Sequence, residues 1–373
     1  MNAVMKLLAA EVARQGPIPF ARFMAMALYC PEVGYYEQIR HTPGRAGDYF
    51  TSVSVGPVFG RLLASQFAGW AADCLESSQE PSGWQIVEAG AHDGRLARDL
   101  LEALGRWAPA DLARLEYVIL EPSRLREQWQ RDTLGDLAGR VRWVPDWPTV
   151  ANPGVQGVIF ANELLDALPA RRLGWDRTQG RWFEWGVSWT DGNFDWARLP
   201  VDPELSPPVQ AWLNDLAATW SLEWTDGHTV EAPESALAWW SAAARSLRRG
   251  RLVAIDYGLE AAAWGLPARK HGTLRAYRQH RLTEAVLERP GEQDLTLHVN
   301  WDLVRNVGET EGLTTALHLP QGRWLSGVLA RQIARNPAIA DWSPADALQF
   351  QTLTHPDQMG ARFQVLVQTR GLG

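Results

Sequence analysis

The stretch QIVEAGAHDGRLARDLLEALG, residues 85–105, determines the class of fold. It begins as an apolar strand, turns at Gly90 and Gly94, and continues as an amphipathic helix that Asp93 is placed to cap and Gly105 to end. The apolar stripe of this helix consists of Leu96, Leu100, Leu101 and Leu104. A strand, a glycine turn and a helix in this order predict an α/β fold that holds a ligand at the helix N-terminus, although an ordinary structural turn has the same pattern.

Four more apolar segments are continuous rather than alternating, as in strands that are buried on both faces. With the first, they are WQIVEAG (84–90), LEYVILEPS (115–123), VRWVPDW (141–147), GVIFANE (157–163) and RLVAIDYG (251–258). Helical patterns stand between several of them, and a stripe of Leu237, Trp240, Ala244 and Leu247 is expected to end at Gly250. This alternation predicts a mostly parallel sheet with helices on both faces.

Other segments elaborate this core. LTTALHLP (313–320) and ARFQVLVQTR (361–370) have no convincing crossover helix between them, so we expect them to pair antiparallel at one edge. We expect a β-rich inserted lobe at 168–232, with RWFEWGVSW and NFDWARL joined by a turn at Asp191 and Gly192. The resulting division is an N-terminal extension (1–60) covering the ligand site, core halves at 61–167 and 233–373, and a substrate-side loop at 258–300.

The composition disfavours broad nucleic-acid binding, although it leaves room for a local basic patch. A net charge of -7 with 21% charged residues gives no basic field for wrapping nucleic acid. Cys30 and Cys74 lack metal-ligand spacing and suit a reducing compartment, where we expect them to be core thiols. The first 20 residues read as an amphipathic helix carrying Val4, Leu7, Leu8 and Val12 rather than as a signal peptide, and no apolar run reaches the roughly 18 residues of a membrane span. We therefore expect a bacterial cytoplasmic protein.

In an open parallel sheet the ligand lies beyond the carboxyl ends of the strands. The first strand ends at Glu88, Gly90, His92 and Gly94. The second ends at Glu121, where an acid can accept hydrogen bonds from two ribose hydroxyls, unless it is a helix cap or a surface carboxylate. The interval from Gly90 to Glu121 is 31 residues, longer than the roughly 20 of a dinucleotide fold. Asp146 and Trp147 follow the third strand and could read an adenine, or be structural.

The fourth strand leads into Asn162, Glu163 and Asp166. Carboxylates three residues apart share a helical face, and such a pair could hold a guanidinium and accept charge as a nitrogen is alkylated. The alternative is a capping box for the following helix. After the fifth strand, Arg275 and Tyr277 line either a substrate mouth or a plain loop. His271 and His280 lack a third ligand of suitable spacing and are expected to be loop histidines rather than metal ligands.

Several separate motifs carry a resemblance to a known family. They are FMAMALYCPEVGYY, GRAGDYFTSVSVGPVFG, ANELLDALP, DYG with GTLRAYRQH, GEQDLTLHVNWDLV and HPDQMGARFQVLVQTR. The chain resembles the MidA family of S-adenosylmethionine-dependent methyltransferases, and these motifs occur in the family's order from residue 16 to residue 370.

The resemblance implies a class I methyltransferase fold, which is Rossmann-like with a seven-stranded sheet and an antiparallel last strand, and it implies S-adenosylmethionine as cofactor. Gly90 and Gly94 match the turn glycines and Glu121 the ribose-binding acid. Asn162, Glu163 and Asp166 match the NE..DA.P motif, and Gly47, Asp48, Thr51 and Ser52 match the GD[FY].TS segment expected near the cofactor. The turn departs from the family's E-x-G-x-G-x-G at His92.

Mitochondrial relatives are implied to act in respiratory complex I assembly and to dimethylate an arginine of a complex I subunit. We therefore predict a methyltransferase that transfers a methyl group to a nitrogen of a protein arginine. Its expected partner is a respiratory-complex protein or another assembly protein. A catalytically silent assembly or binding module is the alternative, which His92 favours and the retained Glu121, Asn162, Glu163 and Asp166 oppose. A nicotinamide-dependent oxidoreductase is opposed by the missing G-x-G-x-x-G.

Overall fold

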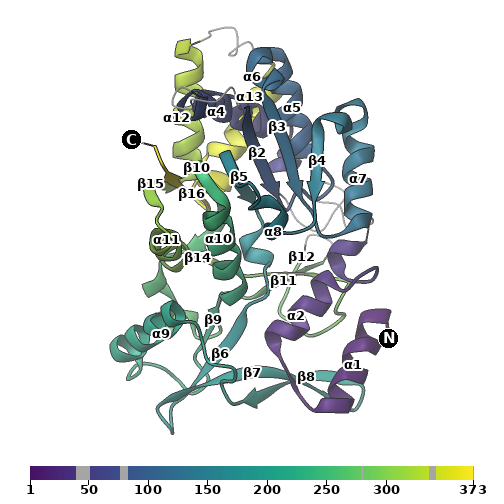
Figure 1. Cartoon of the computed structure of the whole chain (residues 1–373). Coiled ribbons are helices and arrows are strands. Elements are labelled where there is room, and N and C mark those ends of the chain that lie inside the picture. The colour runs from purple at the N-terminus through teal and green to yellow at the C-terminus, as the bar shows by residue number, and fades with distance from the viewer. Residues whose placement is uncertain (39–50, 76–82, 279–280, 336–341, 373) are drawn as a thin grey trace. The chain divides into compact units, whose positions relative to one another are not determined.

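The computed structural model describes residues 1–38, 51–75, 83–278, 281–335 and 342–372 (Figure 1). The chain forms two compact units. The first, which we call the sheet unit, comprises Phe50–Leu165, Ser241–Tyr257 and Gly308–Gly373. The second, which we call the lobe, comprises Met1–Tyr49, Asp166–Trp240 and Gly258–Val307.

Seven strands of the sheet unit lie in the order β4-β3-β2-β5-β10-β16-β15. Their bounds are β2 Trp84–Ala89, β3 Leu115–Leu120, β4 Val141–Val144, β5 Val155–Asn162, β10 Leu247–Leu259, β15 Thr314–Pro320 and β16 Phe363–Arg370. The strands from β4 to β10 are parallel, and β16 runs antiparallel between β10 and β15. This order with a reversed last strand is the class I arrangement, so the predicted fold class is confirmed. All five predicted apolar strands are present.

The sheet is buried on both faces. Ile86 and Phe160 belong to one apolar core with the helices, and Val87 and Ile159, which alternate with them along the strands, are also fully buried. The helices of this unit are α3 Ser52–Val55, α4 Val58–Leu75, α5 Arg95–Trp107, α6 Pro109–Ala113, α7 Arg124–Leu134, α8 Trp147–Val150, α12 Gln321–Arg335 and α13 Pro344–Thr354. Helices α10 (Glu234–Ser246) and α11 (Trp301–Thr310) each run from the lobe into the sheet unit. Burial on both faces explains why these strands lack alternation in the sequence.

Several predicted boundaries were wrong. The N-cap of α5 is Gly94 rather than Asp93, and the helix continues past Gly105 to Trp107. Helix α10 ends at Ser246, and Leu247 already begins β10. The two C-terminal strands pair antiparallel at the sheet edge as predicted, but helices α12 and α13 lie between them in the chain.

Gly250 does not end a helix, because it lies within β10 at a close approach of two strands. It pairs with Gly157 of β5, and its φ is 128°. A Cβ at position 250 would stand 1.9 Å from the carbonyl oxygen of Gly157. Glycine is therefore required here for strand contact rather than for helix termination.

In its described residues the lobe contains a five-stranded antiparallel sheet, a small three-stranded one and the short strand β14 (Val299–Asn300), which pairs in parallel with Gly258 and Leu259 of β10. Its strands are β1 Ile18–Pro19, β6 Arg171–Asp176, β7 Arg181–Thr190, β8 Asn193–Leu199, β9 Thr229–Ala232, β11 Arg275–Arg278, β12 Arg281–Thr283, β13 Asp294–Thr296 and β14 Val299–Asn300. Its helices are α1 Ala3–Gln15, α2 Phe20–Tyr29 and α9 Pro207–Trp220. The β7–β8 hairpin turns at Asp191 and Gly192, with φ values of 51° and 84°, as the sequence predicts.

The N-terminal helix α1 is amphipathic as predicted. Val4, Leu8 and Val12 are buried, but Leu7 is 48% exposed. Cys30 is buried in the lobe core, whereas the side chain of Cys74 lies outside the described part. Among the described residues, no helix has the length and apolar character needed to cross a bilayer.

Candidate cofactor and catalytic site

The glycine turn after β2 is built from left-handed residues. Gly90, His92 and Gly94 have φ values of 77°, 46° and 85°. A Cβ at Gly90 would meet Leu164 at 3.2 Å, and one at Gly94 would meet the Cα of Gln130 at 3.0 Å. His92 therefore occupies a conformation that favours glycine, although histidine tolerates it better than most residues. Its side chain is 20% exposed, with Nδ1 3.8 Å from Asp93 Oδ1.

Gln130 of α7 connects this turn to the predicted ribose-binding acid. The fully buried amide donates from Nε2 to the His92 carbonyl oxygen at 3.1 Å and to Glu121 Oε2 at 2.8 Å. Its Oε1 accepts the indole N–H of Trp143 at 2.8 Å. Because an indole nitrogen only donates, this contact fixes which end of the amide is Oε1. Gln130 is not among the residues predicted from the sequence, where its only signal is a polar side chain one helical turn before buried Leu134.

Glu121 stands directly after β3, 5% exposed. Its Oε1 accepts the backbone N–H of Ser123 at 3.0 Å, and Arg126 Nε lies 3.6 Å from Oε2. An ionised carboxylate has about four lone-pair positions. The protein contacts hold the group in one orientation and leave it capacity to accept hydroxyl groups.

Glu88, the acid of the turn motif, lies at the end of β2 and is almost fully buried. Its carboxyl accepts the Tyr117 hydroxyl at 2.6 Å. Burial raises the pKa of Glu88 to about 7, against the opposing effect of the Tyr117 hydrogen bond. Glu88 thus supports the strand that precedes the turn, and contact with the cofactor stays a prediction.

Asn162 and Glu163 come together with Ser52 at the end of β5. Glu163 Oε1 accepts the backbone N–H of Ser52 at 2.8 Å and Nδ2 of Asn162 at 3.3 Å. The Glu163 backbone N–H donates to the carbonyl of Ile255 on the adjacent strand β10 at 2.9 Å. With φ 51°, Glu163 is left-handed, a strained conformation of the kind that concentrates at functional sites.

The prediction that Glu163 and Asp166 share a helical face was wrong. Glu163 lies in a bend, and the short 3₁₀ turn Leu165–Ala167 begins only afterwards. Asp166 belongs to the lobe, where its Oδ2 accepts the hydroxyl of Thr296 at 2.7 Å and its carbonyl accepts the N–H of Leu297 at 2.9 Å. Its carboxylate thus orders β13 of the lobe, and its catalytic role stays a prediction.

The remaining predicted residues differ in what they contact. Asp146 caps α8 through the N–H and hydroxyl of Thr149 at 3.0 and 2.6 Å, and these bonds lower its pKa. Thr51 caps α3. Gly47 and Asp48 lie outside the described residues, as does His280. The adenine and cofactor roles assigned to these positions stay predictions.

The sheet-unit residues fit a nucleoside cofactor. Within the described residues, the buried Asn162 Oδ1 and His92 Nδ1 have no hydrogen-bond partner. Both stand at carboxyl ends of neighbouring parallel strands, where such a fold binds its ligand. A left-handed turn, an oriented carboxylate and two unsatisfied polar atoms are together suited to bind a ribose and an amino-acid group.

Comparison with known proteins identifies the family. Residues 66–319 match a family described as "Putative S-adenosyl-L-methionine-dependent methyltransferase". The Drosophila melanogaster protein named "Protein arginine methyltransferase NDUFAF7 homolog, mitochondrial" is 29% identical over 100% of this chain and 86% of its own length. The Xenopus tropicalis protein arginine methyltransferase NDUFAF7 is 26% identical over 97% of this chain and 85% of its own.

A crystal structure from Burkholderia thailandensis, bound to S-adenosyl-homocysteine, matches with a TM-score of 0.82 and 30% identity, covering 100% of this chain and 92% of the other. A native crystal structure from the same organism matches with a TM-score of 0.80 and 30% identity, and covers the same shares of both chains. The prediction of a bacterial cytoplasmic location was wrong by this comparison, because the curated relatives are named as mitochondrial proteins. The fold, the glycine turn and these matches lead to one conclusion: the chain belongs to the S-adenosylmethionine-dependent methyltransferase family.

Proposed function

We propose that this enzyme methylates an arginine nitrogen of a protein, and that Glu163 contacts the reacting guanidinium. The observation that carries the proposal is the fixed carboxylate of Glu163 at the end of β5, held by Ser52 and Asn162 in a strained backbone. Relatives over nearly the whole chain are named protein arginine methyltransferases, which supports the substrate class. Following the family resemblance, the protein substrate would be a respiratory-complex component or another assembly partner.

Methyl transfer to arginine needs a carboxylate close to the reacting nitrogen, and Glu163 would supply it. S-adenosylmethionine, when bound, supplies a methyl group on a positively charged sulfur. Arginine is always protonated in water, so the enzyme must turn one guanidinium nitrogen lone pair toward the methyl group. The N–C bond would form as the S–C bond breaks, with the sulfur keeping the electron pair, and the methylated nitrogen would pass its proton to the Glu163 carboxylate. A carboxylate that accepts guanidinium hydrogen bonds orients the nitrogen and stabilises the developing charge.

The other residues would divide the work of binding. Glu121 would accept the ribose hydroxyls, and the glycine turn with His92 would lie along the amino-acid part. Asn162 would use its unsatisfied Oδ1 at the boundary between cofactor and substrate, since its Nδ2 already holds Glu163. Asp166 would support the site through its hydrogen bond to Thr296 rather than contact the guanidinium.

The test is Glu163→Gln, which keeps the shape of the side chain and removes its charge. We expect methyl transfer to an arginine-containing protein substrate to fall by at least a hundredfold while S-adenosylmethionine affinity stays within a few fold, because general-base and charge-stabilising groups contribute roughly 10²–10⁴-fold. Mass spectrometry of the substrate and calorimetric titration measure the two quantities. Glu127→Gln, an α7 carboxylate paired with Arg131, is the matched control. Equal loss of transfer and cofactor binding would assign Glu163 to the cofactor pocket.

A further inference from the structure

One segment of the lobe is strongly basic in a chain whose net charge is -7. From residue 267 to residue 283 there is no aspartate or glutamate. The cationic residues of this segment are Arg269, Lys270, Arg275, Arg278 and Arg281, which we call the basic strip. Such an imbalance in an acidic protein indicates a surface that meets negative charge.

The strip lies on and beside the β11–β12 hairpin. Arg278 of β11 stands directly opposite Arg281 of β12 in the antiparallel register. Side chains so placed have Cβ atoms only about 5 Å apart, and like charges in this position destabilise the pair. The register thus places two like charges opposite each other, and a bound anion between them would reduce their repulsion. Arg275, at the other end of β11, is exposed.

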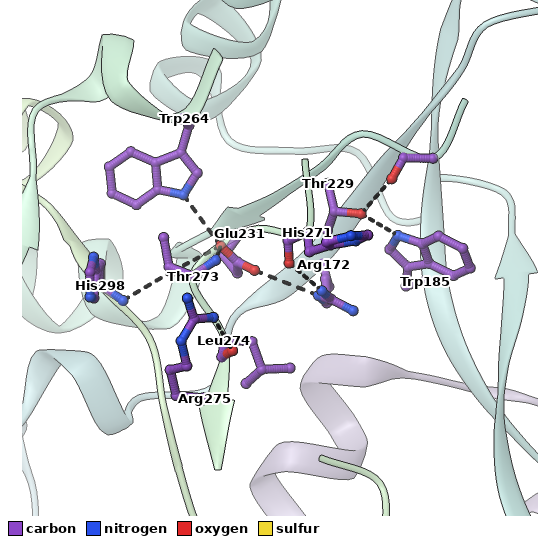
Figure 2. A network of polar contacts seen from close by, with 11 residues as sticks. Arg172, Trp185, Thr229, Glu231, Trp264, His271, Thr273, Leu274, Arg275 and His298 are labelled. Atoms are coloured by element: carbon purple, nitrogen blue, oxygen red, sulfur yellow. Dashed lines mark hydrogen bonds and ion pairs between the residues drawn. The ribbon is translucent and has the colours of Figure 1, made fainter. Parts of the chain in front are cut away.

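Two acids near the strip, Glu231 and Asp294, have other partners. Glu231 is buried and accepts the N–H and hydroxyl of Thr273 at 2.9 and 3.0 Å, with Arg172 3.6 Å away (Figure 2). Figure 2 also shows Arg275 donating to the carbonyl of the preceding Leu274, at 2.8 Å. Asp294 of the neighbouring strand β13 accepts the hydroxyl of Tyr36 at 2.7 Å.

In the described part of the chain, none of the five cations of the strip forms an ion pair with a carboxylate. The field of the strip also acts on His298, which belongs to the same network (Figure 2). Burial first, and then the charges of Arg269 and Arg275, lower the pKa of His298 to about 4. The charges of Arg269 and Arg275 thus add to burial in disfavouring a further positive charge at His298.

We propose that the basic strip binds an acidic segment of the protein substrate, away from the arginine that is methylated. This inference rests on the proposed function, since it names how that substrate is selected. A protein segment fits better than nucleic acid, because surfaces that bind single strands combine cations with several stacking aromatic rings. On the described strands of this hairpin, Tyr277 is the one aromatic residue.

The test uses the full chain and a fluorescent hexaglutamate peptide, with a hexaglutamine peptide and a dT12 oligonucleotide for comparison. We expect the hexaglutamate peptide to bind and its affinity to fall as salt is raised. The triple variant Arg275→Gln, Arg278→Gln, Arg281→Gln should bind it at least tenfold more weakly. The matched control carries the same charge change at Arg106, Arg140 and Arg181, which are exposed and elsewhere. Thermal melting checks folding, and Arg278→Gln alone should not lower the melting temperature, because it removes the repulsion with Arg281.

The outcomes separate this inference from the proposed function. Loss of peptide binding in the hairpin variant but not in the control supports the inference that the basic strip binds acidic segments. No binding, equal loss in both variants, or tighter binding of dT12 than of the peptide overturns it. S-adenosylmethionine affinity and arginine methylation by the wild type are measured in parallel. If arginine is methylated but the hexaglutamate peptide does not bind, the inference about the basic strip is wrong and the proposed function stands. If arginine is not methylated, the proposed function is wrong, whatever the hairpin binds.

Discussion

Gln130 donates its side-chain Nε2 to Glu121 Oε2 at 2.8 Å, and the same nitrogen donates to the carbonyl of His92. One buried amide thus connects the acid after β3 to the glycine turn after β2. Since Trp143 fixes the orientation of this amide, the three groups form one polar unit beside the expected cofactor.

This unit predicts that Gln130→Met weakens cofactor binding about tenfold or more, because Glu121 loses the donor that orients it and two buried polar groups lose a partner. Gln128→Met, an exposed position on the same helix, is the control. Calorimetric titration with S-adenosyl-homocysteine and with its 2′,3′-dideoxy analogue distinguishes orientation from general destabilisation. We expect the loss for the natural ligand only; a similar loss for both ligands would mean that Gln130 only supports the fold.

Glu121→Ala should weaken S-adenosylmethionine binding by about 2 kcal/mol or more, since a hydrogen bond to a charged group contributes roughly 1.5–3 kcal/mol. Titration calorimetry measures the affinity, and thermal melting confirms that the variant is folded. Unchanged affinity in a folded variant would remove Glu121 from the ribose role.

His92 permits a test of the strained turn. His92→Gly should bind S-adenosylmethionine within a few fold of the wild type, because glycine adopts φ 46° freely and the backbone is unchanged. His92→Val should lower the free energy of unfolding by about 1–2 kcal/mol, because a β-branched side chain resists the left-handed region. Chemical denaturation and titration measure the two effects. An enzyme whose wild type does not bind while His92→Gly does would show that the imidazole blocks the site.

Glu88 predicts a dependence of stability on pH. Its pKa is about 7 in the folded chain against an ordinary 4.5, so the folded state holds a proton that the unfolded state releases. The contribution of Glu88 to the stability of the folded state is therefore fully present below pH 4.5 and is lost as the pH rises through 7. Relative to the wild type, Glu88→Gln should gain about 2–3 kcal/mol of unfolding free energy between pH 5 and pH 8.

Urea unfolding of both proteins at several pH values checks this expectation. Asp136→Asn, at an exposed position in the 3₁₀ turn after α7, is the control and should show no such trend. If the unfolding free energies of Glu88→Gln and of the wild type change in parallel across this pH range, Glu88 is ionised in the folded protein. Its buried hydrogen bond with Tyr117 is then misassigned.

The sequence by itself determined the strands, the glycine turn and the β7–β8 hairpin, because each depends on residues close together in the chain. Continuous apolar runs indicate buried strands, and Asp191 with Gly192 specifies a tight turn. The motifs added the family and with it the order of the sheet. Helix ends were predicted less well: Gly250 resembles a helix stop, but the close approach of β5 is the reason that it is glycine.

Only the tertiary structure decided which polar groups meet. Gln130 and the carbonyl of His92 are 38 residues apart in the chain, and Ser52 and Glu163 are 111 apart. No periodicity encodes such pairs, because they form where strand ends and loops converge after the sheet is assembled. The same holds for Asp166, three residues from Glu163 in sequence, whose Oδ2 accepts the hydroxyl of Thr296 of the lobe. Sequence spacing places two residues on one helical face only if a helix forms there, and at Glu163 the left-handed backbone prevents it.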